Sequence, residues 1–239
     1  MTELLLPPAF EPVFVRTDPF AAAVRDVEGE LDQGNFFWSE SSSLFDAALV
    51  LAPEFPVPRM WPARCATMLA VAEALGALGP PTVEVTFSWP DRIMVNGATV
   101  GGVRLALPRD AEPEAVPDWL VIGLTLRLRY PAGTAPGLWP DQTALTEEGF
   151  EDATPRELAE AFGRSLLYWL HQWTEVGPER VATHWLAYLD PAGTTKSSLD
   201  LATGDLLRSA LDGNAVRDPL PPAGDPPGWS LDPIEETAR

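Results

Sequence analysis

The chain has 239 residues, of which 46% are hydrophobic, so it is long enough for one full domain with a small appendage. Its net charge of −19 argues against binding to nucleic acid or to anionic membranes, because both attract a cationic protein surface. The apolar runs end well short of the roughly 20 residues that a membrane span needs. Residues 1–20 contain neither a basic start nor a cleavable apolar run, so we expect a cytoplasmic protein without a secretory signal.

Two residue types are scarce. The single cysteine, Cys65, excludes an intrachain disulfide framework and a cysteine-rich metal site. Of the 16 basic residues, only Lys196 is a lysine. This is typical of a composition shifted towards alanine, proline and arginine. It also means that any mechanism that needs a lysine has one candidate in the whole chain.

The first third of the chain alternates extended and helical patterns. Residues 7–20 are proline-rich, and residues 20–31 place apolar and acidic side chains at helical spacing. Strands are predicted at 36–38 and 44–51, with a serine-rich turn between them. Residues 62–78 form the clearest helix, because apolar residues recur at steps of three and four and indicate one apolar face.

The middle of the chain predicts strands. Residues 83–87 alternate as a strand, and 93–95 and 100–107 flank an Asn96-Gly97 turn, the strongest short hairpin signal. Residues 119–130 form a further strand that begins apolar and then alternates.

The last third begins with helices. Thr154 and Glu157 form a capping box around Pro155, which starts a helix that ends at Gly177-Pro178. A second helix follows at 179–189, and residues 199–211 form one more amphipathic segment.

These elements predict an α+β fold with a mostly antiparallel sheet flanked by helices. We divide the chain into a domain at 1–190, a small extension at 191–216 and a flexible, proline-rich acidic tail at 217–239.

A window of 17 residues, 87–103, carries a resemblance to a known family. The signature of biotin protein ligases runs Lys-Trp-Pro-Asn-Asp-Leu, then Asn-Gly-x-Lys, then a Val-Gly-Gly-Ile strand. Here Trp89-Pro90, Asn96-Gly97 and Val100-Gly101-Gly102 stand at the same spacing. The chain therefore resembles the biotin/lipoate protein ligase superfamily.

The flanking segments resemble the same family. Residues 121–126 read Val-Ile-Gly-Leu-Thr-Leu and are similar to its Val-Ile-Gly-Ile-Gly-Leu strand. Residues 36–51 stand where the family has a Trp-x-Ser-Pro strand and turn. The helix that ends at 167–173 resembles the one near the end of the catalytic domain, so the resemblance covers roughly residues 10–190.

Family members make an acyl-adenylate from ATP and biotin, lipoate or a medium-chain fatty acid, and pass the acyl group to a lysine of a carrier domain. The resemblance therefore implies ATP with Mg as cofactor and biotin or lipoate as substrate. Attack of a carboxylate on a phosphate joins two anions, whose repulsion must be offset by cations and backbone N–H donors.

This sequence keeps the glycines of the signature and lacks its lysines. Ser88 and Thr99 occupy the two lysine positions, and the Asn-Asp pair is replaced by Asp91-Arg92. No Gly-Arg-rich loop lies between residues 31 and 36. The arginines available to compensate are Arg92, Arg104, Arg127 and Arg129, but an arginine fork does not reproduce the geometry of a lysine.

The resemblance implies Asp91 and Arg92 as catalytic residues, and the sequence itself indicates no metal site. The implied ligand-binding residues are Trp38, Ser88, Trp89, Pro90, Gly97, Thr99, Gly101, Gly102 and Gly123.

For several of these residues a structural role is the alternative. Gly101-Gly102 line a pocket or mark a bulged strand, Trp89-Pro90 form a wall of the site or a buried corner, and Asp91 is a site carboxylate or a solvated turn residue. Cys65 is read as a small buried hydrophobe rather than an acyl-transfer nucleophile.

Two functions stay open. The first is a divergent enzyme or binding protein that holds a carboxylate ligand of the biotin, lipoate or octanoate class beside Gly101-Gly102, and transfers it to a carrier protein if active. The alternative is a catalytically inactive, ligase-like partner in a protein assembly. Carrier domains of this superfamily are commonly acidic, so the charge of −19 favours a basic partner. The sequence indicates no oligomeric state.

Overall fold

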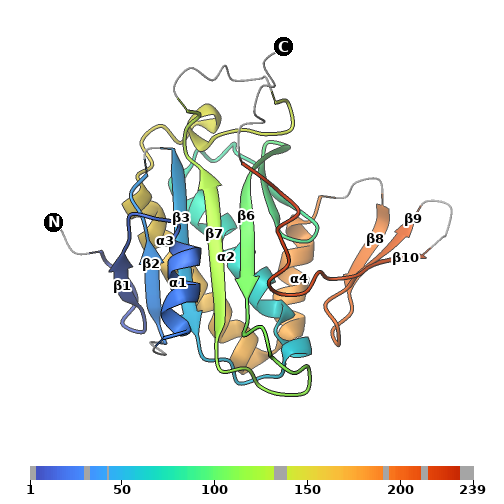
Figure 1. The fold of residues 1–239 in the computed structure, drawn as a ribbon. Helices are drawn as coiled ribbons and strands as arrows, with labels where there is room; N and C mark the ends of the chain where they lie inside the picture. The colour runs from blue at the N-terminus through green and yellow to red at the C-terminus, as the bar shows by residue number, and fades with distance from the viewer. Residues whose placement is uncertain are drawn as a thin grey trace, which may run out of the picture.

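A seven-stranded sheet forms the centre of the structure, a computed structural model that describes residues 4–29, 33–41, 43–131, 139–190, 194–210 and 215–231. Its strands lie in the order β1-β2-β3-β7-β6-β5-β4, and every neighbouring pair is antiparallel except β1 and β2. The predicted α+β fold with a mostly antiparallel sheet flanked by helices is confirmed (Figure 1). The strands are β1 (Glu11–Phe14), β2 (Asn35–Trp38), β3 (Leu44–Leu51), β4 (Val85–Ser88), β5 (Arg92–Val95), β6 (Ala98–Ala106) and β7 (Leu120–Arg127).

Helices cover both faces of this sheet (Figure 1). On the outer face lies α1 (Pro19–Val27), which begins at the N-cap Asp18 and packs against β3 and β7. On the inner face lie α2 (Trp61–Leu78), α3 (Pro155–His171) and α4 (Pro178–Tyr188). The hydrophobic core between the sheet and these three helices is the larger of two buried clusters.

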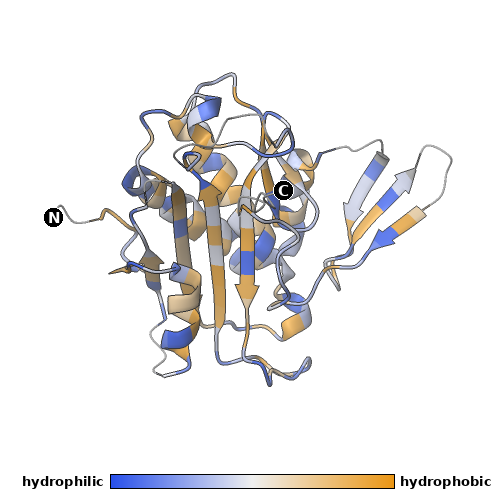
Figure 2. Ribbon diagram, turned by 45° about the horizontal axis from the view of Figure 1, so that its top comes forward, coloured by the Kyte–Doolittle hydropathy of each residue, from blue (hydrophilic) through white to orange (hydrophobic). Residues whose placement is uncertain are grey.

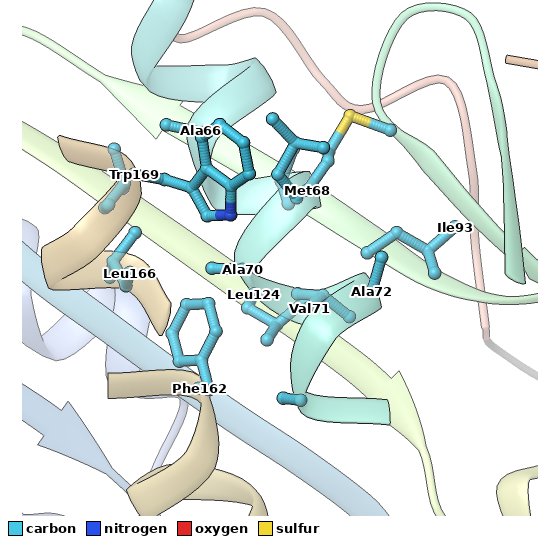
Figure 3. Close-up of a cluster of buried hydrophobic side chains, with 14 of the residues drawn as sticks. Ala66, Met68, Ala70, Val71, Ala72, Ile93, Leu124, Phe162, Leu166 and Trp169 are labelled. Carbon is cyan, nitrogen blue, oxygen red and sulfur yellow. The ribbon is translucent and has the colours of Figure 1, made fainter. Parts of the chain in front are cut away.

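The burial of α2 differs from the prediction of one apolar face. The helix is buried all round from Trp61 to Ala72, because α3, α4 and the sheet all pack against it, and only its last turns reach the surface. Small residues make this possible, since Ala63, Ala66 and Ala70 are fully buried and let neighbouring backbones approach closely. Figure 3 shows the packing of Ala66, Ala70 and their neighbours against Phe162, Leu166 and Trp169 of α3.

The predicted hairpin within the signature window is present. Asn96 and Gly97 have φ of 49° and 84°, the positive values that a type I′ turn needs, and β5 pairs with β6 on either side of them. A β-bulge follows, because Ile93 pairs with Gly101 whereas Met94 pairs with Thr99. The hairpin therefore bends at the glycine pair.

The capping box of α3 is confirmed. The Glu157 N–H donates to Thr154 Oγ1 at 3.2 Å, and the Thr154 N–H donates to Glu157 Oε2 at 3.1 Å. The helix continues through a π-helical turn (Gln172–Val176) to Gly177, where the sequence predicts its end.

The extension after residue 190 forms a separate small sheet, which projects from the body of the molecule (Figure 2). It contains β8 (Thr194–Leu199), β9 (Leu206–Ala210) and β10 (Ala215–Asp218), all antiparallel. Residues 199–211, predicted as one amphipathic segment, are thus divided between two strands. The chain reverses at 200–205, where the Gly204 N–H donates to the Asp200 carbonyl and Gly204 has φ of 79°.

The tail predicted at 217–239 begins within β10, and residues 219–231 then run across the outer face of β6 (Figure 1). Residues 211–214 and 232–239 lie outside the described part of the chain. Across the described ranges, no helix is long and apolar enough to cross a membrane.

Two glycines give a direct test of this packing. A Cβ on Gly101 would lie 1.9 Å from the Thr125 carbonyl oxygen, whereas a Cβ on Gly76 would meet nothing within 4 Å. Backbone atoms of β7 cannot rotate away, so we expect Gly101→Ala to lower the free energy of unfolding by about 3 kcal/mol or more. Gly76→Ala in α2 is the control and should raise it by about 0.5–1 kcal/mol. Urea denaturation measures both, and equal effects would contradict the close approach of β6 to β7.

Candidate functional site

The turn between β4 and β5 contains Trp89, Pro90 and Asp91, which the sequence predicts as site residues. The Trp89–Pro90 peptide bond is cis. The Trp89 ring packs edge-on against Trp185 of α4, with ring centroids 5.8 Å apart. Trp89 therefore packs against the helical layer, as a corner of the core, and Pro90 lies near Gly228.

Asp91 forms a buried ion pair that the sequence did not indicate. Its Oδ2 atom lies 3.6 Å from Nη1 of Arg64 on α2, and the two side chains are 6% and 7% exposed. Burial raises the pKa of Asp91, although Arg64, the Gly228 N–H and Arg92 oppose this shift. Burial also lowers the pKa of Arg64. Asp91 is thus a partner for a buried cation and not a solvated turn carboxylate.

Arg92 points along the outer face of the sheet. It pairs with Ser88 in the β4–β5 register and with Gly102 in the β5–β6 register. Its Nη2 atom donates to the Gly228 carbonyl oxygen at 2.7 Å. The C-terminal segment therefore binds Arg92, the cation that pairs with Ser88 at the signature's first lysine position.

Three of the four predicted glycines lie under different neighbours. Gly101 packs on the backbone of β7, as described above. A Cβ on Gly102 would lie 2.2 Å from Nε1 of Trp229, and a Cβ on Gly123 would lie 2.4 Å from the Phe20 ring. Close packing explains all three glycines, and Gly102 and Gly123 are covered from the outer side by Trp229 and α1.

Three other predicted residues lie apart from Gly102. Trp38 is buried in the inner core with the Phe14 ring edge-on to it. Gly97 lies in the exposed hairpin turn. Thr99 is buried, and its backbone pairs with the Asp141 carbonyl and the Thr143 N–H.

A cleft of about 650 Å³ opens on the outer face of the sheet. Its walls come from residues 14–18 before α1, from the β2–β3 turn at 39–44 and from the C-terminal segment at 227–231. Its floor is Asp46 of β3, Thr125 of β7 and Arg104 of β6. Its volume lies within the range of small-molecule sites.

A chain of polar contacts crosses this floor. Arg104 donates to both carboxylate oxygens of Asp18, at 3.0 and 3.1 Å, and to Thr125 Oγ1 at 3.2 Å. Thr125 Oγ1 in turn donates to Asp46 Oδ1 at 2.6 Å. Arg104 therefore binds Asp18 directly and is connected to Asp46 only through Thr125.

The two carboxylates have opposite pKa shifts. Burial alone would raise the pKa of Asp18, but the hydrogen bonds and charge of Arg104 and the N–H groups of α1 lower it overall. Burial raises the pKa of Asp46, and the hydrogen bond from Thr125 offsets only part of this. The anion that holds Arg104 is thus Asp18, the N-cap of α1.

The sequence contained a signal for the polar residues that form the floor of the cleft. Asp46 and Thr125 are polar residues within otherwise apolar strands, and Asp18 precedes proline at a helix start. Arg104 was named as a compensating cation, without its partners. The other two lie elsewhere: Arg127 is buried and donates to Gln142 and to the Leu231 carbonyl, and Arg129 is exposed.

Cys65 is 5% exposed, and burial raises the pKa of its thiol to about 12. A thiol with this pKa supplies almost no thiolate near neutral pH, so it is a poor nucleophile. His184 bonds to the Arg180 carbonyl and lies beside Trp169. In the described ranges, no group of three or more His, Cys, Asp or Glu side chains could hold a metal ion.

Comparisons with known proteins show the family to which the chain belongs. The model of the biotin/lipoate A/B protein ligase family matches residues 6–187.

The chain belongs to the biotin/lipoate A/B protein ligase family.

Solved structures of the family agree. A biotin protein ligase-like protein of unknown function from Silicibacter sp. TM1040 is 30% identical with a TM-score of 0.78, over 91% of this chain and 97% of that one. Biotin protein ligase from Aquifex aeolicus in complex with biotin and ATP is 14% identical, with a TM-score of 0.66, over 86% and 94%. Biotin protein ligase from Leishmania major in complex with biotinyl-5-AMP is 16% identical, with a TM-score of 0.55, over 88% and 98%. A search of curated proteins found no match.

The charges that line the cleft do not favour ATP. Among the charged residues that line the cleft, Asp18, Glu40 and Asp46 outnumber Arg16 and Arg104. Ser88 and Thr99, at the signature's lysine positions, carry no charge. A polyphosphate would therefore meet more negative than positive charge at this ligase-family cleft.

The buried ion pair gives a test. Asp91→Asn would leave the Arg64 guanidinium buried without a counter-charge, so we expect a loss of about 3–5 kcal/mol in the free energy of unfolding. Asp110→Asn removes an exposed carboxylate and should change it by less than about 0.5 kcal/mol. Thermal and urea unfolding measure both. If Asp91→Asn is as mild as its control, the pair is not structural.

Proposed function

We propose that this ligase-family protein binds a small organic acid of the biotin, lipoate or octanoate class in the outer-face cleft, with Arg104 as the partner of its carboxylate. The observation that carries this proposal is the position of Asp18. The protein's own carboxylate lies on the Arg104 guanidinium in the two-pronged geometry that a ligand carboxylate would adopt.

Exchange of one carboxylate for the other is physically reasonable. The Asp18 side chain is 45% exposed, so water can solvate it when a ligand displaces it from Arg104. The ligand would then take over both hydrogen bonds. Phe14, Val15 and Leu44 line the cleft and offer an apolar surface for the hydrocarbon part of such an acid.

The proposal is binding without activation. ATP does not fit the charges of the cleft, and Cys65 is buried with a raised pKa. Transfer through an acyl-enzyme would need a nucleophile on this chain, and its only thiol is unsuited to that role.

A second candidate is a partner role in a protein assembly, and the small sheet favours it. β10 pairs only with β9 among the described strands, and Ala215, Val216 and Arg217 are exposed along it. An open strand edge can pair with a strand of another protein. The family's carrier domains, and a basic partner matched to the charge of −19, are the two classes of partner to test.

Isothermal titration with biotin, lipoate and octanoate tests the first function. We expect at least one acid to bind the wild-type chain. Arg104→Gln should weaken that binding about 10–100-fold, because two charge-assisted hydrogen bonds are lost. Arg129→Gln removes an exposed arginine that donates to the Glu151 carbonyl and should leave the affinity unchanged.

Two results would contradict the proposal. One is that none of the three acids binds, which would favour the partner role. The other is that an acid binds with the same affinity in Arg104→Gln, which would place the ligand elsewhere. Circular dichroism of each variant shows whether it has folded.

A further inference from the structure

Residues 221–231 cross the outer face of β6 and form one wall of the cleft (Figure 1). Three arginines from three elements donate to backbone carbonyls along this segment. Arg64 of α2 donates to Pro221 at 3.3 Å, Arg92 of β5 donates to Gly228 at 2.7 Å, and Arg127 of β7 donates to Leu231. The segment is thus fixed at its start, near its end and at its end.

Trp229 is the side chain that this arrangement places over the sheet. Its indole Nε1 lies directly over Gly102, the position where any Cβ would collide with it. Gly102 and Arg104 stand two residues apart on the same face of β6. A ligand that lies on Arg104 and extends along β6 therefore meets the Trp229 ring.

The contacts of this segment are of a kind that opens easily. Its exposed residues include Pro222, Gly224, Asp225, Pro226 and Gly228. The Gly224 N–H donates to the Leu105 carbonyl at 2.8 Å, the Gly228 N–H bonds to Asp91, and the other anchors given above are arginine side chains. A segment with few buried apolar contacts opens at a much lower free energy than the whole domain.

The closed position also leaves polar groups unsatisfied. Trp229 Nε1 and Arg92 Nε are buried and have no hydrogen-bond partner among the described residues. Buried donors without partners are costly. Release of the segment would return both N–H groups to water, so part of the cost of opening is offset.

We propose that residues 221–231 form a strap that closes the cleft from within the same chain, and that ligand and strap compete for the surface over Gly102 and Arg92. Closure covers Arg92 and the backbone of Gly102, which would otherwise extend the cleft beyond Arg104. The ligand competition rests on the proposed function, whereas the closure itself does not. A ligand that binds only the open form has its affinity reduced by the fraction of chains that are closed.

Trp229→Ala in the full chain tests the strap, with Tyr168→Ala as the control because Tyr168 is an exposed aromatic of α3. Hydrogen–deuterium exchange is measured over peptides that cover 219–231 and over α2. In wild type we expect the strap amides to be protected. In Trp229→Ala they should exchange at least tenfold faster while α2 is unchanged, and Tyr168→Ala should match wild type.

Titration with octanoate completes the test. We expect its affinity to rise at least tenfold in Trp229→Ala. Strap amides that exchange no faster in this variant would overturn the strap, whatever octanoate does. Faster exchange with an unchanged octanoate affinity would overturn the competition. Faster exchange with no binding of biotin, lipoate or octanoate by either protein would uphold closure and remove the proposed function instead.

Discussion

The Arg104 guanidinium connects three parts of the outer face. It bonds to both oxygens of Asp18, it donates to Thr125, and it lies 4.6 Å over the Phe20 ring. Asp18 caps α1 by accepting from the Phe20 N–H, and Phe20 covers Gly123. One cation therefore sets where α1 sits on the sheet and also forms the floor of the cleft beside it. The same contacts explain why a glycine stands at position 123, since a larger residue would displace the helix that Arg104 anchors.

Three further arginines, outside the lining of the cleft, are also engaged, and the cleft itself is lined by two cations, Arg16 and Arg104. Arg64 is paired with Asp91, Arg92 donates to Gly228, and Arg127 donates to Gln142 and Leu231. A cation whose charge is already compensated by a carboxylate or a carbonyl attracts a phosphate only weakly. A single carboxylate needs only one such group, and it can compete with the half-exposed Asp18 for Arg104. A carboxylate ligand needs one cation, whereas the phosphates of ATP need several. This is why we propose binding without activation.

The sequence predicted those parts of the structure that are encoded locally. The Asn96-Gly97 hairpin, the capping box at Thr154 and the order of strands within the signature window depend on residues a few positions apart, and all are present. The contacts that shape the cleft join distant segments, such as Arg92 with Gly228 and Arg64 with Asp91. Periodicity does not encode the path of a proline-rich segment, because its anchors are carbonyl oxygens that every residue carries. The motif located the right strands, but packing against β7, α1 and Trp229 accounts for its glycines.

Because the chain belongs to the ligase family, the main question is whether it activates an acid with ATP. ATP–pyrophosphate exchange answers it directly, since radiolabelled pyrophosphate enters ATP only when an acyl-adenylate forms reversibly. The assay is run with Mg and saturating biotin, lipoate or octanoate, on the wild-type chain and on Trp229→Ala, so that a closed strap cannot hide an activity. The charges of the cleft predict no exchange above background in either protein, even where the acid binds. Exchange that depends on the acid would contradict this account and would show that arginines replace the missing lysines.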